Sequence, residues 1–360
     1  MKILFLVDSL DAGGAGRVVS QLANQMALNG YQVFVATLFE NQVSYKIAIN
    51  VVHVPLAAGM LTDSYLKRVH RIRDVAKKNH IEIVISLLTN INVYAIFAGF
   101  FSSWKTIISE RNDPNRNPKS KRVRIFRNFF YTFADGFVFQ TEDAKGYFSK
   151  AIQRRGIVIF NPICDSFPQP FEGTRSKRIV SVGRLVPQKN FPMAIEAFAQ
   201  IAEKYSDYIY EIFGEGKEQA NLKQLICDKK LESRVFLRGQ RLNVFDEIID
   251  ATLFVMSSDY EGMSNALIEA LALGLPTIST DHPIGGAKML IEDSVNGILI
   301  PVGDSKALAS KMDLLIGDKK KAYELGKQTQ SIRKMLSIEH IADEWLNYIR
   351  THIPHPLGPK

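Results

Sequence analysis

The amino-acid sequence predicts an α/β protein of two doubly wound, Rossmann-like domains that face a central cleft. The chain has 360 residues, more than one domain usually holds. Apolar strands alternate with helical stretches through both halves, as in a parallel sheet covered on both faces. A break rich in proline at residues 161–176 is typical of a linker between domains. We assign residues 1–165 to an N-terminal domain, 166–337 to a C-terminal domain, and 338–360 to a helix and tail that pack back towards the N-terminal domain.

The first half begins with an apolar strand at residues 2–7, followed by a glycine-rich turn at 11–16 and a helix at 17–29. Gly30 follows that helix, where glycine commonly ends one. The remaining elements of this half follow from the same periodicities. They are strands at residues 32–38, 81–87, 105–109, 136–139 and 157–160, and helices at 64–79, 120–133 and 142–150.

The second half repeats the alternation. Strands are predicted at residues 178–182, 208–213, 235–237, 253–256, 276–279 and 297–300, and helices at 192–204, 217–229 and 265–273. Three helical segments close the chain, the last at 338–350. In such a sheet a ligand binds at the carboxyl ends of the strands, where the strand order reverses. We therefore expect the chemistry to lie at these strand ends.

Composition narrows the class of protein. No run of 18 apolar residues predicts a transmembrane helix. The short apolar N-terminus meets Asp8 and Asp11, which suits a buried strand better than a signal peptide. Cys164 and Cys227 are the only cysteines and form neither a disulfide framework nor a metal site. We expect a cytoplasmic protein without a metal or another cofactor.

The net charge of +8 belongs to the first half: residues 1–172 hold 21 Lys and Arg against 13 Asp and Glu, whereas residues 173–360 hold 24 of each. Many of these cations fall in two predicted helices, as Lys67, Arg68, Arg71, Arg73, Lys77, Lys78, Lys121, Arg124 and Arg127. Such a surface can hold a protein on anionic lipid, so we expect a peripheral position at the inner face of the cell membrane. No nucleic-acid-binding motif accompanies the charge. A stripe at helical spacing, which we interpret as facing the core, comprises Phe126, Phe129, Phe130 and Phe133.

Residues 258–270, SDYEGMSNALIEA, contain two glutamates eight residues apart, Glu261 and Glu269. Eight residues of helix rise about 12 Å, whereas the paired carboxyl groups of a glycosidase lie roughly 5–9.5 Å apart. The two glutamates therefore cannot easily act as acid and base on one bond, but they can bind different parts of an elongated ligand. Between them the N–H groups of Met263, Ser264 and Asn265 begin a helix, where phosphate binds. A nucleotide sugar has this order of sugar, diphosphate and ribose.

Two further kinds of segment can contact such a ligand. Residues 182–190, VGRLVPQKN, place Arg184 and Lys189 in one loop, where two cations can neutralise a departing diphosphate without a metal. A solvated loop with two surface cations explains the same residues. The turns DAGGAGR at 11–17, FGEG at 213–216 and FLRG at 236–239 let backbone approach a ligand, although each can be a plain turn. The first turn lacks the third glycine of a dinucleotide-binding site, because Val19 stands there.

Taken together, GGAGR, GRLVPQKN, FGEG, FLRG and EGMSNALIEALALGLPTIST resemble glycosyltransferase family 4 over essentially the whole chain. The resemblance implies the GT-B fold, a retaining mechanism and no requirement for a metal. It implies that Glu261 contacts the donor sugar near the reacting carbon, that Glu269 holds the ribose, and that Arg184 and Lys189 bind the diphosphate. The donor-binding residues that it adds are Gly14, Gly16, Gly214, Arg238, Met263, Ser264 and Asn265.

One segment departs from the family pattern. Many members have a histidine after about the fourth strand of the first domain, but residues 108–114 here read ISERNDP. Arg111 stands in that place, and Glu110 or Asn112 can take over a contact with the sugar or the acceptor. A capped loop leading into the next helix fits the segment equally well.

These expectations combine into a retaining transfer of a hexose or N-acetylhexosamine from an NDP-sugar, with UDP as the expected nucleotide, to a lipid-linked glycan acceptor. The product would be a surface polysaccharide such as capsule or exopolysaccharide. The alternatives are an epimerase or phosphorylase of the same fold, a non-catalytic sugar-nucleotide-binding protein, and an NAD-dependent oxidoreductase, which Val19 disfavours. The cations Arg184 and Lys189 favour a transferase, because a sensor has no leaving group to neutralise.

Overall fold

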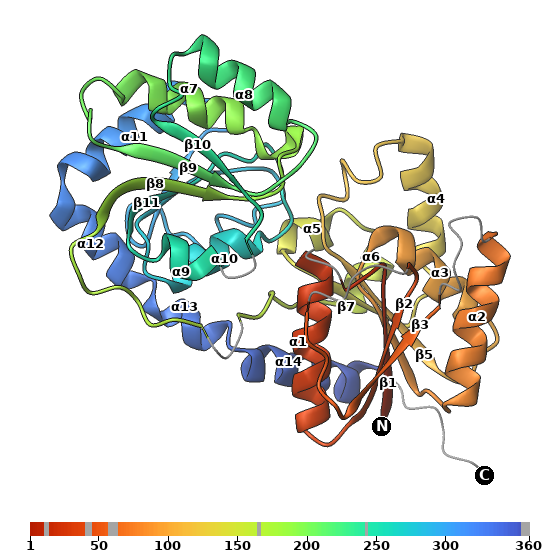
Figure 1. The fold of residues 1–360 in the computed structure, drawn as a ribbon. Coiled ribbons are helices and arrows are strands. Elements are labelled where there is room, and N and C mark those ends of the chain that lie inside the picture. The colour runs from red at the N-terminus through yellow and green to blue at the C-terminus, as the bar shows by residue number, and fades with distance from the viewer. Residues whose placement is uncertain (11–13, 40–44, 57–63, 164–166, 242–243, 354–360) are drawn as a thin grey trace. The chain divides into compact units, whose positions relative to one another are not determined.

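The computed structural model describes residues 1–10, 14–39, 45–56, 64–163, 167–241 and 244–353. The chain divides into two compact units, each built around one parallel sheet (Figure 1). Unit 1 comprises Met1–Cys164 and Leu336–Lys360, and unit 2 comprises Asp165–Met335. Residues 11–13 of the predicted glycine-rich turn, 164–166 of the predicted linker and 354–360 of the predicted tail lie outside the described residues.

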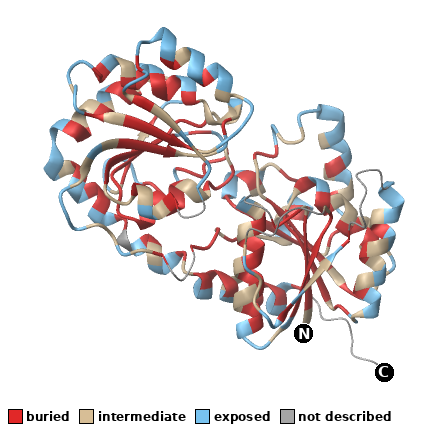
Figure 2. Cartoon of the chain, viewed as in Figure 1, coloured by how far each residue is buried: buried red, intermediate tan, exposed pale blue. Residues whose placement is uncertain are grey.

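The sheet of unit 1 has the strand order β3-β2-β1-β4-β5-β6-β7. Its strands are mostly apolar over their whole length because helices cover both faces, and β1 is buried from Ile3 to Val7 (Figure 2). The strands are β1 (Lys2–Val7), β2 (Gln32–Thr37), β3 (Val51–Pro55), β4 (Ile83–Ser86), β5 (Lys105–Glu110), β6 (Gly136–Phe139) and β7 (Gly156–Val158).

Helices α1 (Gly14–Leu28) and α14 (Ile338–His352) lie on one face of this sheet, and α2 (Tyr65–Lys78), α3 (Thr89–Gly99) and α4 (Lys121–Tyr131) lie on the other (Figure 1). Two short helices, α5 (Glu142–Gly146) and α6 (Lys150–Arg154), precede β7. The backbone N–H of Phe137 in β6 donates to the Tyr348 hydroxyl of α14 at 2.8 Å. This bond ties the last described helix to the sheet of unit 1.

The sheet of unit 2 has the order β10-β9-β8-β11-β12-β13. The strands are β8 (Ser176–Val182), β9 (Ile209–Phe213), β10 (Val235–Gly239), β11 (Ala251–Met256), β12 (Thr277–Thr280) and β13 (Ile298–Ile300). Helices α7 (Phe191–Ile201), α8 (Gln219–Asp228) and α11 (Ser305–Gly317) lie on one face, and α9 (Val244–Ile248) and α10 (Asn265–Ala272) lie on the other (Figure 1). Helices α12 (Lys319–Gln328) and α13 (Gln330–Met335) complete the unit.

Both sheets place their strands in the same permutation of chain order. In each unit the second and third strands of the chain lie in turn on one side of the first strand. The fourth strand pairs with the other side of the first, and the later strands follow it outward. The order therefore reverses between β1 and β4 in unit 1 and between β8 and β11 in unit 2. In doubly wound sheets the crevice at this reversal, beyond the carboxyl ends of the strands, is where ligands bind.

Each predicted strand lies within two residues of an observed strand at both ends, whereas several helix predictions were wrong. Helix α1 begins at Gly14, so Gly14 and Gly16 belong to a helix and not to the preceding turn. The helix predicted at 142–150 is divided into α5 and α6, and four helical segments, α11 to α14, follow β13 where three were expected. Strand β3 and helices α3 and α9 were not predicted.

Candidate functional site

The strand-order reversal of unit 2 brings two sequence-predicted residues together. Lys189 follows β8 and Glu261 follows β11, and Lys189 Nζ lies 2.7 Å from Glu261 Oε1. The exposed fractions of the two side chains are 13% and 12%, so the ion pair is mostly shielded from water. A shielded pair of opposite charges at this place can orient a polar ligand that enters between the strand ends.

The backbone around the pair is held by hydrogen bonds between neighbouring loops. The Ser258 hydroxyl donates to Glu261 Oε1 at 3.1 Å, and the Ser257 hydroxyl donates to the Lys189 carbonyl at 2.8 Å. The hydroxyl of Thr280, at the end of β12, donates to the Ser258 carbonyl at 2.6 Å. The positions of the cation and the carboxylate are therefore set by the ends of three adjacent strands, which preorganises the pair.

Glycines allow these loops to approach one another closely. A Cβ on Gly214, whose φ is +143°, would lie 2.0 Å from the Gly183 carbonyl oxygen. A Cβ on Gly286 would lie 1.9 Å from the carbonyl oxygen of Gly262, the residue next to Glu261. Glycine is required at both positions because a side chain would push the loops apart. Gly214 thus has a packing role, and its predicted contact with a nucleotide stays a prediction.

The other predicted donor-site residues of unit 2 that are considered next lie close in sequence to Lys189 or to Glu261. Arg184 is exposed, and its guanidinium makes no hydrogen bond or ion pair with any residue in the described ranges. Ser264 precedes α10 without making a side-chain cap, and Met263, Ser264 and Glu269 are buried. The N-terminus of α10, which begins at Asn265, carries the partial positive charge of a helix start.

Arg238 has a partner of its own. Its Nε donates to Glu211 Oε1 at 2.6 Å, and Arg178 Nη1 lies 2.8 Å from the other oxygen of the same buried carboxylate. The guanidinium of Arg238 is therefore part of a charge cluster across β8, β9 and β10. The predicted contact of Arg238 with the donor stays a prediction. In such a contact the guanidinium would have to bind the donor and Glu211 at the same time.

In unit 1, Glu110 is the last residue of β5 and is 2% exposed. Its carboxylate accepts hydrogen bonds from the Thr89 hydroxyl at 2.7 Å and the Tyr131 hydroxyl at 3.1 Å, and Arg127 Nη1 lies 3.8 Å away. Burial raises the pKa of Glu110, and the Arg127 guanidinium opposes that rise. The carboxylate thus belongs to an internal polar network, and its predicted contact with a sugar stays a prediction.

Two expectations about α4 were wrong. Arg127 was expected on the basic surface, but it is 2% exposed because it neutralises Glu110 and donates to the Pro114 and Asn117 carbonyls at 3.0 and 2.6 Å. The phenylalanine stripe was expected in the core, yet three of its four members are exposed by 51–59%, namely Phe126, Phe129 and Phe133. The buried positions of α4 are Arg127 and Tyr131, so α4 presents aromatic rings to solvent.

The neighbouring residues Arg111 and Asn112 follow the end of β5. Arg111 Nη1 donates to the Asn161 side-chain oxygen, and the guanidinium carbon lies 5.8 Å from the centre of the Trp345 ring. Burial lowers the pKa of Arg111 to about 9. The Asn112 side-chain oxygen accepts the backbone N–H of Asp113 at 2.8 Å, and neither interpretation of this segment is tested. Gly14 and Gly16 lie in the first turn of α1.

His282 was missed by the sequence reasoning. It lies two residues beyond β12, is 2% exposed, and has Nδ1 3.1 Å from the Pro283 carbonyl oxygen. Burial lowers its pKa, and the charges of Glu261 and Lys189 also act on the imidazole, which places it beside their pair. A single histidine outside any motif carries no signal in the sequence, and only the adjacency of β11 and β12 brings it here.

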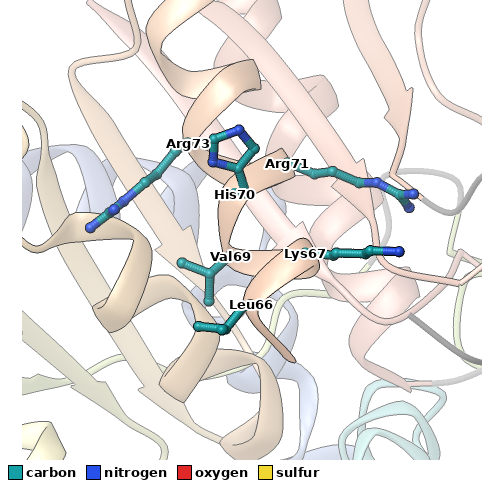
Figure 3. A pocket seen from close by; sticks show the side chains of 6 residues that line it. All are labelled: Leu66, Lys67, Val69, His70, Arg71 and Arg73. Atoms are coloured by element: carbon teal, nitrogen blue, oxygen red, sulfur yellow. The ribbon is translucent and has the colours of Figure 1, made fainter. Parts of the chain in front are cut away.

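A hollow of about 560 Å³ lies along α2 and is lined by Leu66, Lys67, Val69, His70, Arg71 and Arg73 (Figure 3). Lys67 and Arg71 point to one side of the helix and Arg73 to the other (Figure 3). None of the predicted donor-site residues lines it. Among the described residues, no group of three or more His, Cys, Asp and Glu side chains could hold a metal ion. Within the same ranges, every helix falls short of the length and apolar character that crossing a membrane requires.

Solved structures define the class of fold. HepE from Anabaena, crystallised with UDP and glucose, superposes with a TM-score of 0.83 at 20% identity, over 98% of this chain and 100% of that chain. Sucrose-phosphate synthase from Thermosynechococcus elongatus gives 0.86 at 18% identity, over 97% and 98% of the two chains. The predicted two-domain GT-B fold is confirmed.

Family comparisons then give the family. Residues 12–167 match the family described as Glycosyltransferase Family 4, and residues 165–332 match Glycosyl transferases group 1. The chain belongs to glycosyltransferase family 4, as its motifs predicted, and it is a glycosyltransferase.

Among curated relatives, a Campylobacter jejuni protein is 28% identical over 97% of this chain and 98% of its own length. It is an α-1,4-N-acetyl-D-galactosaminyltransferase acting on a GalNAc-GalNAc-diNAcBac-PP-undecaprenol substrate. The poly(ribitol-phosphate) α-N-acetylglucosaminyltransferase of Staphylococcus aureus is 32% identical, over 48% of this chain and 35% of that protein.

Proposed function

We propose that the protein transfers a hexose or N-acetylhexosamine from a UDP-sugar to a lipid-linked glycan acceptor, with retention of configuration and without a metal. The observation that carries the proposal is the shielded Lys189–Glu261 pair at the strand-order reversal of unit 2. It places a cation for phosphate beside a carboxylate for sugar hydroxyls, which are the two chemistries that a nucleotide sugar presents.

The acceptor class is supported by the full-length relatives. Two Campylobacter jejuni proteins that align with this chain over 97% of its length carry names with undecaprenol-linked diphosphate glycans. Both transfer N-acetylgalactosamine, and the S. aureus relative transfers N-acetylglucosamine. We therefore place the protein in the synthesis of a surface glycan, with an N-acetylhexosamine as the first donor to test.

The chemical step is the one that the family resemblance implies. The bond between the anomeric carbon and the diphosphate oxygen breaks, and the acceptor hydroxyl oxygen forms the new bond to that carbon on the same face. The leaving diphosphate accepts the hydroxyl proton, so no protein base is required. Lys189, Arg184 and the N-terminus of α10 stabilise the charge that grows on the diphosphate. Glu261 holds Lys189 in position and accepts hydrogen bonds from the donor sugar.

The test is release of free nucleotide from a panel of UDP- and GDP-sugars, in the presence of a polyprenyl-diphosphate-linked glycan. We expect acceptor-dependent UDP release, an α-linked product, and no loss of activity with EDTA. K204Q is the matched control for K189Q, because Lys204 is also an ion-paired lysine of unit 2 but is 63% exposed. Sugar interconversion without nucleotide release would contradict a transferase and favour an epimerase.

We also propose that unit 1 holds the enzyme on anionic membrane at the cytoplasmic face. Two rings of α4 and the ring of Phe133, which follows it, are exposed. Exposed cations lie on α2 and α4, on the same face of the sheet: Lys67, Lys77, Lys78, Lys121 and Arg122. Arg73 does not contribute, because it donates to the Phe97, Ala98 and Phe100 carbonyls at the end of α3. Exposed aromatic rings and exposed cations on one face of a protein suit the interface of an anionic bilayer.

Vesicle co-sedimentation tests this surface. Binding should require anionic lipid, weaken with salt, and fall in the variant F129S/F133S. L28S is the matched control, because Leu28 is 71% exposed on α1, which covers the opposite face of the sheet. Equal binding of F129S/F133S and wild type would refute the role of the aromatic rings, and equal binding to neutral vesicles would refute the role of the cations.

A further inference from the structure

Two adjacent side chains of unit 1 present three buried N–H donors for which the structure supplies no acceptor. Arg111 Nε, Arg111 Nη2 and Trp345 Nε1 are inaccessible to solvent and make no hydrogen bond with any described residue. The guanidinium carbon lies 5.8 Å from the centre of the Trp345 ring. Arg111 follows β5 and Trp345 lies in α14, so both belong to unit 1. Buried donors normally have partners, and three together indicate a missing acceptor.

The Arg111 side chain is held in one orientation. Its Nη1 donates to the Asn161 side-chain oxygen, which also accepts Gln140 Nε2 at 2.8 Å. The two unsatisfied nitrogens, Nε and Nη2, form one edge of the guanidinium. That edge is the fork that binds two oxygens of a phosphate or carboxylate with two parallel hydrogen bonds. Because Nη1 is the nitrogen bonded to Asn161, the edge formed by Nε and Nη2 stays available for an oxyanion.

Within the described ranges, no carboxylate pairs with the Arg111 guanidinium. Glu110, the adjacent residue, is engaged by Thr89, Tyr131 and Arg127, and the Asp113 carboxylate accepts the Asn115 N–H at 2.8 Å. Burial lowers the pKa of Arg111, and no carboxylate in the described part of the chain opposes that shift. A buried water could satisfy the donors but would leave the charge uncompensated. An anion satisfies both.

We propose that Arg111 and Trp345 bind an oxyanion of a substrate, namely oxygens of a diphosphate group. The identity of the anion rests on the function proposed above, in which the sugar donor and the lipid-linked acceptor both carry a diphosphate. The Arg111 fork takes two oxygens, and the Trp345 indole N–H binds a third or shares one. This assigns an anion site to unit 1 besides the cations of unit 2.

Trp345 itself reports on the site. The chain has two tryptophans, so the variant W104F leaves Trp345 as the only indole emitter. Inorganic pyrophosphate is titrated into W104F, with N-acetylglucosamine as the neutral probe. We expect a saturable change in Trp345 emission with pyrophosphate only. The variant W104F/R111K keeps the charge but loses the fork, and we expect its affinity for pyrophosphate to fall about tenfold.

A second variant and two further probes complete the test. W345F keeps the aromatic ring and removes only the N–H, and we expect pyrophosphate to raise its Tm less than it raises that of W104F. UDP and geranyl diphosphate distinguish the source of the anion: an emission response to UDP alone assigns the donor, and a response to geranyl diphosphate alone assigns the acceptor. No emission change with any diphosphate, or equal affinity in W104F and W104F/R111K, would overturn the proposal.

Sugar transfer by W104F is measured separately. If W104F transfers sugar but its emission ignores every diphosphate, the anion site is refuted while the proposed function stands. If its emission responds to pyrophosphate and no donor is consumed, the anion site stands and the proposed function is refuted.

Discussion

The Lys189–Glu261 pair gives a prediction that separates stability from activity. The perturbation is a set of three variants, K189Q, E261Q and K189Q/E261Q. Each single variant leaves one charge, 12–13% exposed, without the partner that lies 2.7 Å away. The double variant removes both charges and leaves two amides, which can satisfy each other with a hydrogen bond.

The magnitudes follow from the geometry. At an effective dielectric constant of about 20, unit charges at 2.7 Å attract by roughly 6 kcal/mol, most of which offsets the desolvation of the two groups. Because the pair is neither fully buried nor exposed, we expect each single variant to lose about 2–3 kcal/mol of unfolding free energy. For a unit of this size that is roughly 4–12 °C in Tm. The double variant should lose no more than either single variant, since no unpaired charge remains.

Activity should not show this compensation. Loss of the cation on the leaving diphosphate should lower kcat roughly 100- to 1,000-fold, and an amide at position 189 cannot replace it. The double variant should therefore be as inactive as K189Q while its Tm lies close to that of wild type. Thermal unfolding and UDP release, measured on the same preparations, check both parts, with K204Q as the control.

Two results would refute this reasoning. Tm losses that add in the double variant would show that the two side chains are not coupled in solution. Wild-type turnover in K189Q would show that the cation does not act on the leaving group, whatever the stability of the variant.

Three further predictions concern single residues. G286A should lower turnover at least tenfold and reduce Tm. The new Cβ would lie 1.9 Å from the Gly262 carbonyl oxygen, so it must displace the loop that carries the Glu261 carboxylate. Unchanged kinetics would contradict this packing. His282 has a lowered pKa, so at low pH the unfolded chain binds a proton that the folded chain does not bind. The unfolding free energy should therefore fall as pH drops below about 6.5, less steeply in H282Q than in wild type. Parallel pH profiles of the two proteins in urea unfolding would refute this prediction. R127M should cost about 3–5 kcal/mol at pH 8, because it leaves the Glu110 carboxylate buried without its cation. The raised pKa of Glu110 means that protonation relieves this cost, so urea unfolding should show a smaller deficit at pH 5 than at pH 8; a deficit that does not change with pH would point to packing instead.

The strands of both sheets could be predicted from the sequence. A strand covered on both faces is continuously apolar, as in residues 3–7 and 253–256, and such runs stand out from the neighbouring sequence. The caps of α2 were also predictable, since Ser64 accepts the Lys67 N–H and Asn79 follows the last helical residue. Helix α3 was not predictable from its pattern, because residues 89–99 are apolar on several sides and lose the periodicity of an amphipathic helix.

The site divides in the same way. The motifs identified Lys189 and Glu261 one by one, because a loop after a strand and a helix start are local features. The distance between their side chains depends on β8 and β11 being neighbours in the sheet, because Lys189 and Glu261 are 72 positions apart in the chain. His282 depends on β12 lying beside β11 and has no local signature.

In α4 the sequence alone was misleading. Four phenylalanines at helical spacing outweigh one arginine in any reading of periodicity, yet Arg127 and Tyr131 face inward. The reason lies 17 residues away in the chain, in the buried carboxylate of Glu110, which requires a cation and a hydroxyl. Sequence periodicity determines which faces a segment can bury, whereas the groups already present in the core decide which face it does bury.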